Sequence, residues 1–508
     1  MTLNGQSLTI TQLVKVARQK ETVILAEEAK EKIKQCRAYL EEKIVSGEVI
    51  YGVNTGFGEF SHTKIAPEKI KELQLNLIRS HASGVGDLLP EEVVRAMMLL
   101  RINALAHGHS GISLEVVETL CQMLNKNVLP LIPAQGSVGA SGDLTPLAHL
   151  ALGLIGEGEI VYNGQRQAAT DALAAAGIKP VILKEKEGLA LINGTQLMAA
   201  LGALAVYDAR RLVKYADIAA AFSADVLLSS INHTDELIHQ SRPFKGQRES
   251  AANMRQLLMG SELWESHKNC GKVQDAYSVR CAPQVHGAVR DALDYAQKVI
   301  EIEINSATDN PLIFPDEDRI ISGGNFHGEP VAFAMDFLKI ALAELANISE
   351  RRTARLIDNK LSGHLPTCLT KDGGLNSGLM AAQYVAAALV SENKTLAHPA
   401  SVDSIPTCAN KEDHVSMGAI GARHCRSVAD NVAIVLGIEL LCAAQALDLI
   451  RPKKSSPALE AVYSAIRWQI PAIEKDRVLH YDLMAMKKLV KSGELINRVE
   501  KLWETSVF

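Results

Sequence analysis

Three long segments constrain the fold of this chain of 508 residues more than any other feature, because each is apolar on most sides of a helix. They are residues 197–228, 331–356 and 431–449, the last with a lead-in from Val415. A helix with apolar residues all round is stabilised only when other elements surround it. We therefore expect a central helical bundle, or burial against other subunits, and infer a homo-oligomer.

Other helices are predicted to be amphipathic, after Pro90 and over residues 285–304, where apolar residues recur at helical spacing. The stripes are Val93, Met97, Leu100 and Ala104, and Val285, Val289, Leu293, Ala296, Ile300 and Ile304. Strand signals are short: residues 159–162 before the Asn163–Gly164 turn, and pieces near Ile50 and Ile320. We expect three consecutive regions: 1–193, a helical bundle over 194–450, and a helical tail over 451–508 after a linker at 451–457.

Composition and charge exclude several classes of protein. The chain has 53 basic and 58 acidic residues and a formal charge of −5, without a long run of either sign, so nucleic acid is not an expected partner. Its start lacks the basic and apolar parts of a signal peptide, which favours a cytoplasmic location. Residues 188–207 and 373–391 are uncharged and long enough to span a membrane, but polar residues interrupt both, and we expect buried helices.

Known cofactor motifs are absent from the sequence. It has no phosphate-binding loop, no GxGxxG, no HExxH and no zinc spacing, so neither a nucleotide nor a required metal is predicted. His107 and His109 favour a capping or buried pair over a metal site. The eight cysteines show no CxxC pair and are predicted to be reduced thiols: Cys36, Cys121, Cys270, Cys281, Cys368, Cys408, Cys425 and Cys442.

One glycine-rich segment, residues 136–146, offers unusual chemistry. Taken alone it predicts a tight turn into a helix that Asp143 or Thr145 caps. In a sharply bent loop, however, the Gly142 nitrogen can reach the Ala140 carbonyl. Ring closure, with loss of one water there and one from the Ser141 hydroxyl, leaves an exocyclic methylene conjugated with the ring. Such a group is an electrophile, which no ordinary side chain is.

Residues 139–149 are similar to the signature of the aromatic amino acid ammonia-lyases, whose Ala-Ser-Gly forms a 4-methylidene-imidazol-5-one group. Further blocks resemble that family in the same order, from about Ile50 to about Leu449: residues 51–58, 188–195, 274–280, 305–311 and 323–328. The resemblance implies a mostly α fold, a fumarase/aspartase-like central helical bundle with a smaller N-terminal mixed region that carries the prosthetic-group loop. It also implies a homotetramer with active sites shared between subunits, and a prosthetic group made from Ala140, Ser141 and Gly142.

Within the family, His81 after Ser80, and Glu412, resemble the branch that acts on histidine. The resemblance implies elimination of ammonia from L-histidine to give trans-urocanate. An imidazole ring has two polar nitrogens, so its pocket needs hydrogen-bonding or charged partners. Without the resemblance, Glu412 is a solvated acid and His81 a satisfied helix histidine.

The resemblance also implies roles for other residues. Arg280 matches the arginine that grips the substrate carboxylate, a task for its planar fork. Tyr51 matches the residue proposed to remove the β-proton, for which the phenol needs a lowered pKa and a dry site. Asn193 matches an asparagine near the prosthetic group and the amine. The plain alternatives are a surface ion pair, a packed tyrosine and a turn residue.

Three more residues, Gln274, Tyr277 and Phe326, match positions beside the prosthetic group, and otherwise are ordinary packing or capping residues. His327 receives no role. The chain departs from the family pattern at Lys411, where a glutamine is usual, and this cation beside Glu412 puts the charge of the imidazole pocket in doubt.

Other functions compete with this interpretation. A tyrosine or phenylalanine ammonia-lyase, or an aminomutase, keeps the prosthetic group and changes the outcome, with Glu412 carrying most of the discrimination. The fumarase or aspartase class needs its own serine-loop signature, which the sequence lacks. A catalytically silent helical scaffold requires an unaltered Ala140–Ser141–Gly142. The sequence does not choose between capture of the substrate amine by the methylene group and attack of the methylene group on the aromatic ring.

Overall fold

A computed structural model describes residues 1–268, 271 and 273–503, so Cys270 lies outside the described residues. The chain is mostly helical, which confirms the predicted fold class. It divides into two compact units, each assembled from three segments. The first contains Met1–Tyr207, Ala296–Asp336 and Pro399–Arg423, and the second contains Asp208–Tyr295, Phe337–His398 and His424–Phe508. These units interleave along the chain, and the three consecutive regions expected from the sequence stay a prediction.

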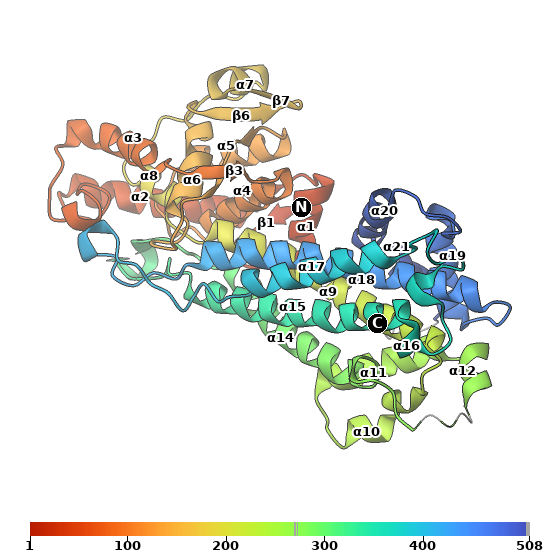
Figure 1. Cartoon of the computed structure of the whole chain (residues 1–508). Helices are drawn as coiled ribbons and strands as arrows, with labels where there is room; N and C mark the ends of the chain where they lie inside the picture. Colours follow the sequence, from red (N-terminus) through yellow and green to blue (C-terminus); the bar gives the residue numbers. More distant parts are fainter. Residues whose placement is uncertain (269–270, 272, 504–508) are drawn as a thin grey trace. The chain divides into compact units, whose positions relative to one another are not determined.

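The first unit is mainly helical and contains several small sheets of two or three strands (Figure 1). Its helices are α1 (Ile10–Gln19), α2 (Glu27–Val45), α3 (Ile70–His81), α4 (Glu91–Leu105), α5 (Leu114–Asn125), α6 (Leu144–Leu154), α7 (Ala169–Ala175) and α8 (Glu187–Ile192). Its paired strands are β1 (Thr2–Leu3) with β2 (Ile24–Leu25), β3 (Val85–Leu88) with β5 (Pro133–Gln135), β4 (Leu129–Pro130) with β6 (Glu159–Tyr162) and β7 (Gln165–Ala168), and β8 (Leu312–Phe314) with β9 (Arg319–Ile321). Helix α4 packs against α1 and α5, and α6 packs against α3 and α8.

Two of the three strand predictions are confirmed. Strand β6 covers residues 159–162 and pairs with β7 across Asn163 and Gly164, which both adopt the left-handed conformation of a tight hairpin turn. Strand β9 contains Ile320. The strand expected near Ile50 is wrong, because this backbone closes a local turn. The Ile50 N–H donates to the Asn54 side chain, and the Ile50 carbonyl accepts from Val53.

Helix α4 forms where the sequence predicts it, but it is not amphipathic. Every residue from Val93 to Leu105 is buried, including Arg95 and Arg101. The Arg95 guanidinium donates to the carbonyl oxygens of Val16 and Leu124, so its charge is buried together with acceptors. The prediction of an amphipathic helix was wrong because polar side chains do not mark an exposed face here: the five donors of a guanidinium can be satisfied inside a protein.

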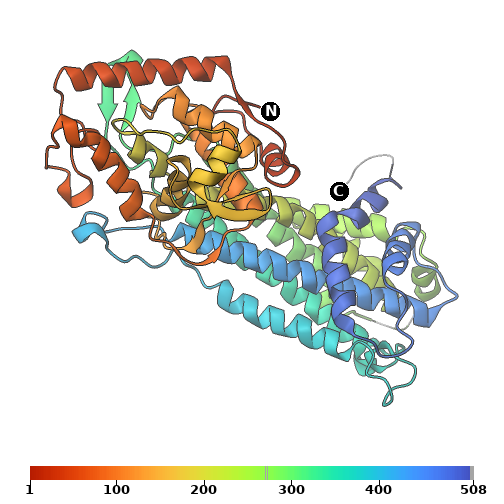
Figure 2. The same cartoon turned by 90° about the horizontal axis from the view of Figure 1, so that it is seen from above.

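Four long helices have residues in both units: α9 (Gln196–Val226), α14 (Ala282–Glu303), α15 (Glu329–Ile357) and α18 (Gly418–Ile450). The other helices of the second unit are α10 (Glu236–Gln240), α11 (Lys245–Leu258), α12 (Glu262–His267), α13 (Tyr277–Arg280), α16 (Asn359–Ser362), α17 (Met380–Leu396), α19 (Pro457–Gln469), α20 (Leu479–Ser492) and α21 (Glu494–Glu500). Within this unit α15, α17 and α18 run side by side in both views (Figures 1 and 2).

The apolar segments differ in how well one chain buries them. Helices α9 and α18 are buried over most of their length, as expected. Helix α15 instead leaves Phe337 and Ile340 exposed. Helix α17 overlaps the second half of the stretch 373–391, and only Ala382, Ala386 and Asn393 in this helix are buried. The prediction that the stretch forms a buried helix is therefore wrong for a single chain.

Among the described residues, α18 is long and apolar enough to cross a membrane by length and composition alone. Its most apolar window is 78% buried inside the protein.

Candidate active site

The segment predicted to carry unusual chemistry forms a sharp turn in the first unit. Gly139 and Gly142 pair as an isolated antiparallel bridge, with Ala140 and Ser141 between them. Ser141 adopts the left-handed conformation with φ 52°, which a residue with a Cβ rarely adopts. The three residues 140–142 therefore lie in a tight turn.

The turn is held against the end of α8. The Gly194 N–H donates to the Ser141 carbonyl at 3.2 Å, and the Asp143 N–H donates to the Gly194 carbonyl at 2.6 Å. A Cβ added to Gly142 would lie 2.1 Å from the Gly194 oxygen, so only glycine fits at position 142. The requirement for Gly142 is thus set by close packing of two loops that are about fifty residues apart in sequence.

Asp143 begins helix α6, but its side chain does not cap that helix as predicted. Its carboxylate instead accepts from the Met198 N–H at 2.9 Å, in the first turn of α9, and from the Ser137 hydroxyl at 3.1 Å. Burial raises the pKa of this carboxyl to about 7, against the opposing effect of these hydrogen bonds. Asp143 thus connects the turn to α9.

A cavity of about 560 Å³ lies beside the turn, entirely within the first unit. It brings together four residues that the sequence singled out from distant blocks: Tyr51, His81, Ser141 and Glu412. Apolar side chains form much of the remaining wall: Phe57, Phe60, Ile65, Leu73, Leu77, Leu144, Leu189 and Ile192. The cavity is therefore a mainly apolar pocket with a few polar groups, which is typical of a small-molecule site.

Glu412 reaches the turn directly. The Ser141 hydroxyl donates to Glu412 Oε1 at 3.4 Å, and the Thr407 hydroxyl donates to Oε2 at 2.6 Å. Nothing in the sequence indicated that Thr407 contacts Glu412. The contact arises because the two residues pair across a short loop. Lys411, in contrast, does not line the cavity, and its side chain is exposed and pairs with Glu59 at 3.9 Å.

His81 ends helix α3 and lines the same cavity. Its Nδ1 lies 2.9 Å from the Leu77 carbonyl oxygen. A carbonyl can only accept, so Nδ1 carries the proton and, in the neutral ring, Nε2 is an acceptor. The cavity thus contains two acceptors, the His81 ring and the Glu412 carboxylate.

Tyr51 follows the loop after α2, and its phenol oxygen accepts from the Gly58 N–H at 3.2 Å. Burial raises the pKa of Tyr51 above its usual value, and the Gly58 hydrogen bond opposes this with a smaller effect. The Cys408 and Glu412 charges also raise this pKa. The lowered pKa that the role of base requires stays a prediction.

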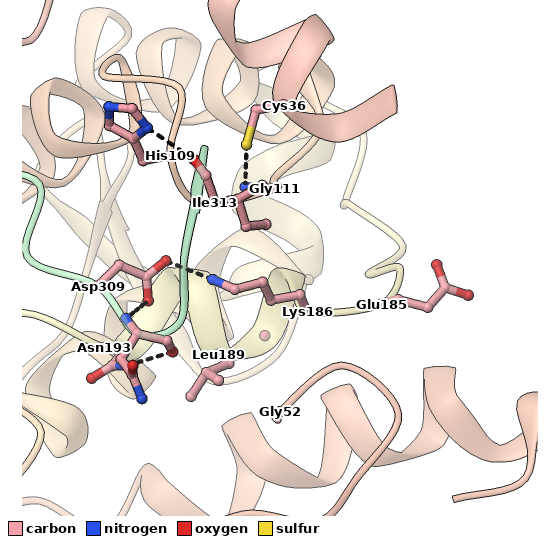
Figure 3. A network of polar contacts seen from close by, with 12 residues as sticks. Cys36, Gly52, His109, Gly111, Glu185, Lys186, Leu189, Asn193, Asp309 and Ile313 are labelled. Atoms are coloured by element: carbon pink, nitrogen blue, oxygen red, sulfur yellow. Dashed lines mark hydrogen bonds and ion pairs between the residues drawn. The ribbon is translucent and has the colours of Figure 1, made fainter. Parts of the chain in front are cut away.

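Asn193 is buried at the end of α8 (Figure 3). Its carbonyl accepts from Arg101 Nη1 at 2.8 Å, and its Nδ2 donates to the Asn310 carbonyl at 3.0 Å. Its Oδ1 has no hydrogen-bond partner among the described residues. Phe326 lies half-buried in the loop between β9 and α15 and is not among the residues that line the cavity.

Gln274, Tyr277 and Arg280 belong to the second unit. Gln274 and Tyr277 are exposed, and the Arg280 guanidinium carbon lies 4.6 Å from the centre of the Tyr277 ring. Arg280 Nε is buried without a partner among the described residues. The guanidinium is thus stacked on an aromatic ring, a geometry that lysine cannot reproduce.

A buried ionic network supports α13, which carries Tyr277 and Arg280. Arg352 binds both oxygens of Glu439, at 2.5 and 2.9 Å, and also donates to the Ser278 carbonyl in α13. Neither Arg352 nor Glu439 is exposed. Sequence reasoning missed both residues because they lie in segments that are otherwise apolar.

The chain was compared with known proteins. A family model described as aromatic amino acid lyase matches residues 8–468. The histidine ammonia-lyase of Caldanaerobacter subterraneus subsp. tengcongensis is 55% identical over 493 residues, which cover 97% of each chain. The crystal structure of histidine ammonia-lyase from Trypanosoma cruzi has a TM-score of 0.93 at 45% identity, covering 100% of this chain and 96% of that one. The tyrosine aminomutase of Streptomyces globisporus has a TM-score of 0.94 at 40% identity, covering all of both chains.

Proposed function

Because this chain belongs to the aromatic amino acid lyase family, we propose that it is a carbon–nitrogen lyase that converts L-histidine to trans-urocanate and ammonia. One observation carries the choice of substrate: Glu412 and His81 present two acceptors in the cavity that also contains Ser141. A protonated imidazole offers two ring N–H donors, one for each of these acceptors, and a neutral imidazole offers one. Relatives named histidine ammonia-lyase at 50–55% identity support the same choice.

The residues at the turn fit the prosthetic group that the family implies. We propose that Ala140, Ser141 and Gly142 form the methylidene-imidazolone by ring closure and loss of two waters. The bend at Ser141 and the absence of room for a side chain at Gly142 support this. Once formed, the group supplies an electrophilic methylene that can capture the substrate and make its amine a better leaving group.

The residues of the cavity then hold and deprotonate the substrate. Glu412 and His81 bind the imidazole ring, and the Thr407 hydroxyl fixes the orientation of the Glu412 carboxylate. Tyr51 takes the β-proton. Its partial burial raises the pKa of the phenol, and the hydrogen bond from the Gly58 N–H opposes that effect.

Arg280 grips the substrate carboxylate as a planar fork, with Tyr277 stacked against it. The unpartnered Arg280 Nε supports this role, because a buried guanidinium N–H requires an acceptor. Asn193 orients the substrate amine, and the family resemblance assigns Gln274 and Phe326 to positions beside the prosthetic group. No metal and no nucleotide enters this scheme.

We further propose a cytoplasmic homotetramer whose sites combine residues from several subunits. Tyr277 is 71% exposed and Tyr384 on α17 is 59% exposed, and Phe337 and Ile340 add apolar surface on α15. Exposed apolar side chains along long helices are typical of surfaces that other subunits cover. Light scattering of the purified protein at increasing dilution tests the assembly.

A tyrosine lyase or aminomutase is the second candidate, since the tyrosine aminomutase of Streptomyces globisporus is 40% identical to the whole chain. Its substrate carries a phenol, whose single O–H donor satisfies only one of the two acceptors, His81 and Glu412, whereas a protonated imidazole satisfies both.

The decisive experiment offers L-histidine, L-tyrosine and L-phenylalanine separately and records the ultraviolet spectrum of each product. We expect fastest turnover of L-histidine, with urocanate as product. Faster turnover of L-tyrosine than of L-histidine would contradict the proposed substrate. A product in which the amine has returned to the β-carbon would contradict the proposed lyase activity. The mass of the peptide over residues 136–146 tests the prosthetic group independently, because cyclisation makes it lighter by two waters. An unmodified mass in active protein contradicts the mechanism.

A further inference from the structure

We propose that Lys186 and Asp309 are positioning residues for Asn193, an inference that rests on the proposed function. Lys186 Nζ lies 2.7 Å from Asp309 Oδ2, and the two side chains are 0% and 1% exposed (Figure 3). Two charges removed so completely from water remain stable only when they pair with each other and satisfy their other hydrogen bonds. The place of each charge is therefore tightly determined.

The ion pair is connected to Asn193 from both sides. Lys186 immediately precedes helix α8, and Asn193 immediately follows it. Asp309 Oδ1 accepts from the Asn310 N–H at 2.7 Å, and the carbonyl of the same Asn310 accepts from Asn193 Nδ2 at 3.0 Å. The Asn310 side chain is also held, because its Oδ1 accepts from the Gly323 N–H at 2.7 Å.

These contacts fix the direction of the Asn193 carboxamide. Because an amide is planar, binding Nδ2 to the Asn310 carbonyl turns Oδ1 to the opposite side. Oδ1 is buried and has no partner among the described residues. An unpaired buried acceptor is unfavourable, so this arrangement keeps an acceptor ready for a donor outside the chain. The amine of the substrate is such a donor.

Lys186 and Asp309 bind each other, so neither is expected to touch the substrate. Asn193 lies nearer the cavity, because it follows Ile192, which lines the cavity, and precedes Gly194, whose N–H donates to the Ser141 carbonyl. The charge on Lys186 holds the Asp309 carboxylate, and the carboxylate accepts from the Asn310 N–H. The carbonyl of the same residue accepts from the Asn193 amide. A change at position 309 should therefore affect recognition of the amine and leave recognition of the imidazole and carboxylate intact.

The test measures equilibrium binding in the full chain with Ser141→Ala, which stops turnover and removes any dependence on the prosthetic group. Calorimetry compares L-histidine with imidazolepropionate, which keeps the ring and the carboxylate but lacks the α-amine. We expect Asp309→Asn to weaken binding of L-histidine about tenfold and to change binding of imidazolepropionate by less than about twofold. Asn193→Ala should give the same selective loss, and combining both changes should add little to either alone.

Equal weakening of both ligands by Asp309→Asn, or full additivity with Asn193→Ala, overturns the proposal and leaves the ion pair with a purely structural role. If Asp309→Asn does not fold, Asp309→Glu replaces it, since this variant keeps the charge and displaces the carboxylate by one methylene. Retention of wild-type selectivity by Asp309→Glu also contradicts the proposal. Failure of the proposed function is seen separately, as failure of the chain carrying Ser141→Ala alone to bind L-histidine.

Discussion

The Ser141 hydroxyl donates to the Glu412 carboxylate at 3.4 Å, although 271 positions separate the two residues in the sequence. One belongs to the turn from which we propose the prosthetic group forms, and the other to the proposed imidazole site. Their contact means that the reactive group and the group that selects the substrate share one wall of the cavity. A substrate bound by its ring at Glu412 is thus held within reach of position 141.

Replacing Ser141 by alanine should remove activity and leave the fold intact. The hydroxyl is required for the second loss of water, while the turn itself depends on Gly139 and Gly142, which remain. We expect kcat to fall on the order of a thousandfold or more, because only binding contributions to the rate remain. The peptide over residues 136–146 should then keep its unmodified mass. Wild-type turnover in this variant would contradict the proposed prosthetic group.

Replacing Glu412 by glutamine should reduce kcat/KM for L-histidine by about ten to a hundredfold, since a charge-assisted hydrogen bond to the ring becomes a neutral one. The same change should affect L-tyrosine much less. Lys411→Ala is the matched control, because Lys411 is adjacent but exposed and pairs only loosely with Glu59. We expect the control to change kcat/KM by less than about twofold. An equal loss of kcat/KM in both variants would show that the conformation of the loop, and not the Glu412 carboxylate, determines the activity with L-histidine.

The pH dependence of kcat/KM should report Tyr51. The base must be ionised to take the β-proton, and burial raises the pKa of this phenol above its usual value near 10. The active fraction therefore increases as pH rises, and kcat/KM should continue to climb beyond pH 9, about tenfold per unit where this ionisation limits the rate. If kcat/KM instead became constant below pH 9, ionisation of a group other than Tyr51 would control its pH dependence. Tyr51→Phe should remove this activity at every pH.

Replacing Glu439 by glutamine should destabilise the protein strongly. Arg352 is fully buried and binds both Glu439 oxygens, so the change leaves an unpaired guanidinium in the interior. We expect a loss of about 3–5 kcal/mol in the free energy of unfolding. Glu494→Gln serves as the control, because its pair with Arg498 is half-exposed on α21 and should contribute less than about 0.5 kcal/mol. Urea unfolding of both variants measures the difference.

Removal of divalent metals should leave activity unchanged, since the proposed chemistry requires none. Among the described residues, His327, Glu329 and His414 bring three possible ligand atoms within 4.8 Å of one another. Dialysis against a chelator followed by assay with and without added zinc tests the expectation. Loss of activity that zinc restores would contradict it, and His327→Ala would then show whether this group is responsible.

The sequence predicted the helical class, the hairpin at residues 159–168 and the turn at Ser141, because each depends on local properties. Periodic apolar residues define helices, Asn163–Gly164 defines a tight hairpin, and small residues permit the bend at 139–142. The same local reasoning failed for Asp143, which was expected to cap its own helix and instead accepts from Met198. It also failed for α4, which was expected to be amphipathic and is buried throughout from Val93 to Leu105.

By itself, the sequence determined which residue types are available to the site: Ser141 between small neighbours, a tyrosine, a histidine, a glutamate and an arginine in recognisable blocks. Only the tertiary structure decided that Tyr51, His81, Ser141 and Glu412 line one cavity. It also decided that Gly194 leaves room for nothing larger than glycine at position 142. The buried ion pair of Lys186 and Asp309, which is connected to Asn193 through Asn310, likewise follows only from the tertiary structure. The physical reason is that hydrogen bonds, burial and pKa depend on distances between residues far apart in the chain. Spacing along the sequence does not encode those distances.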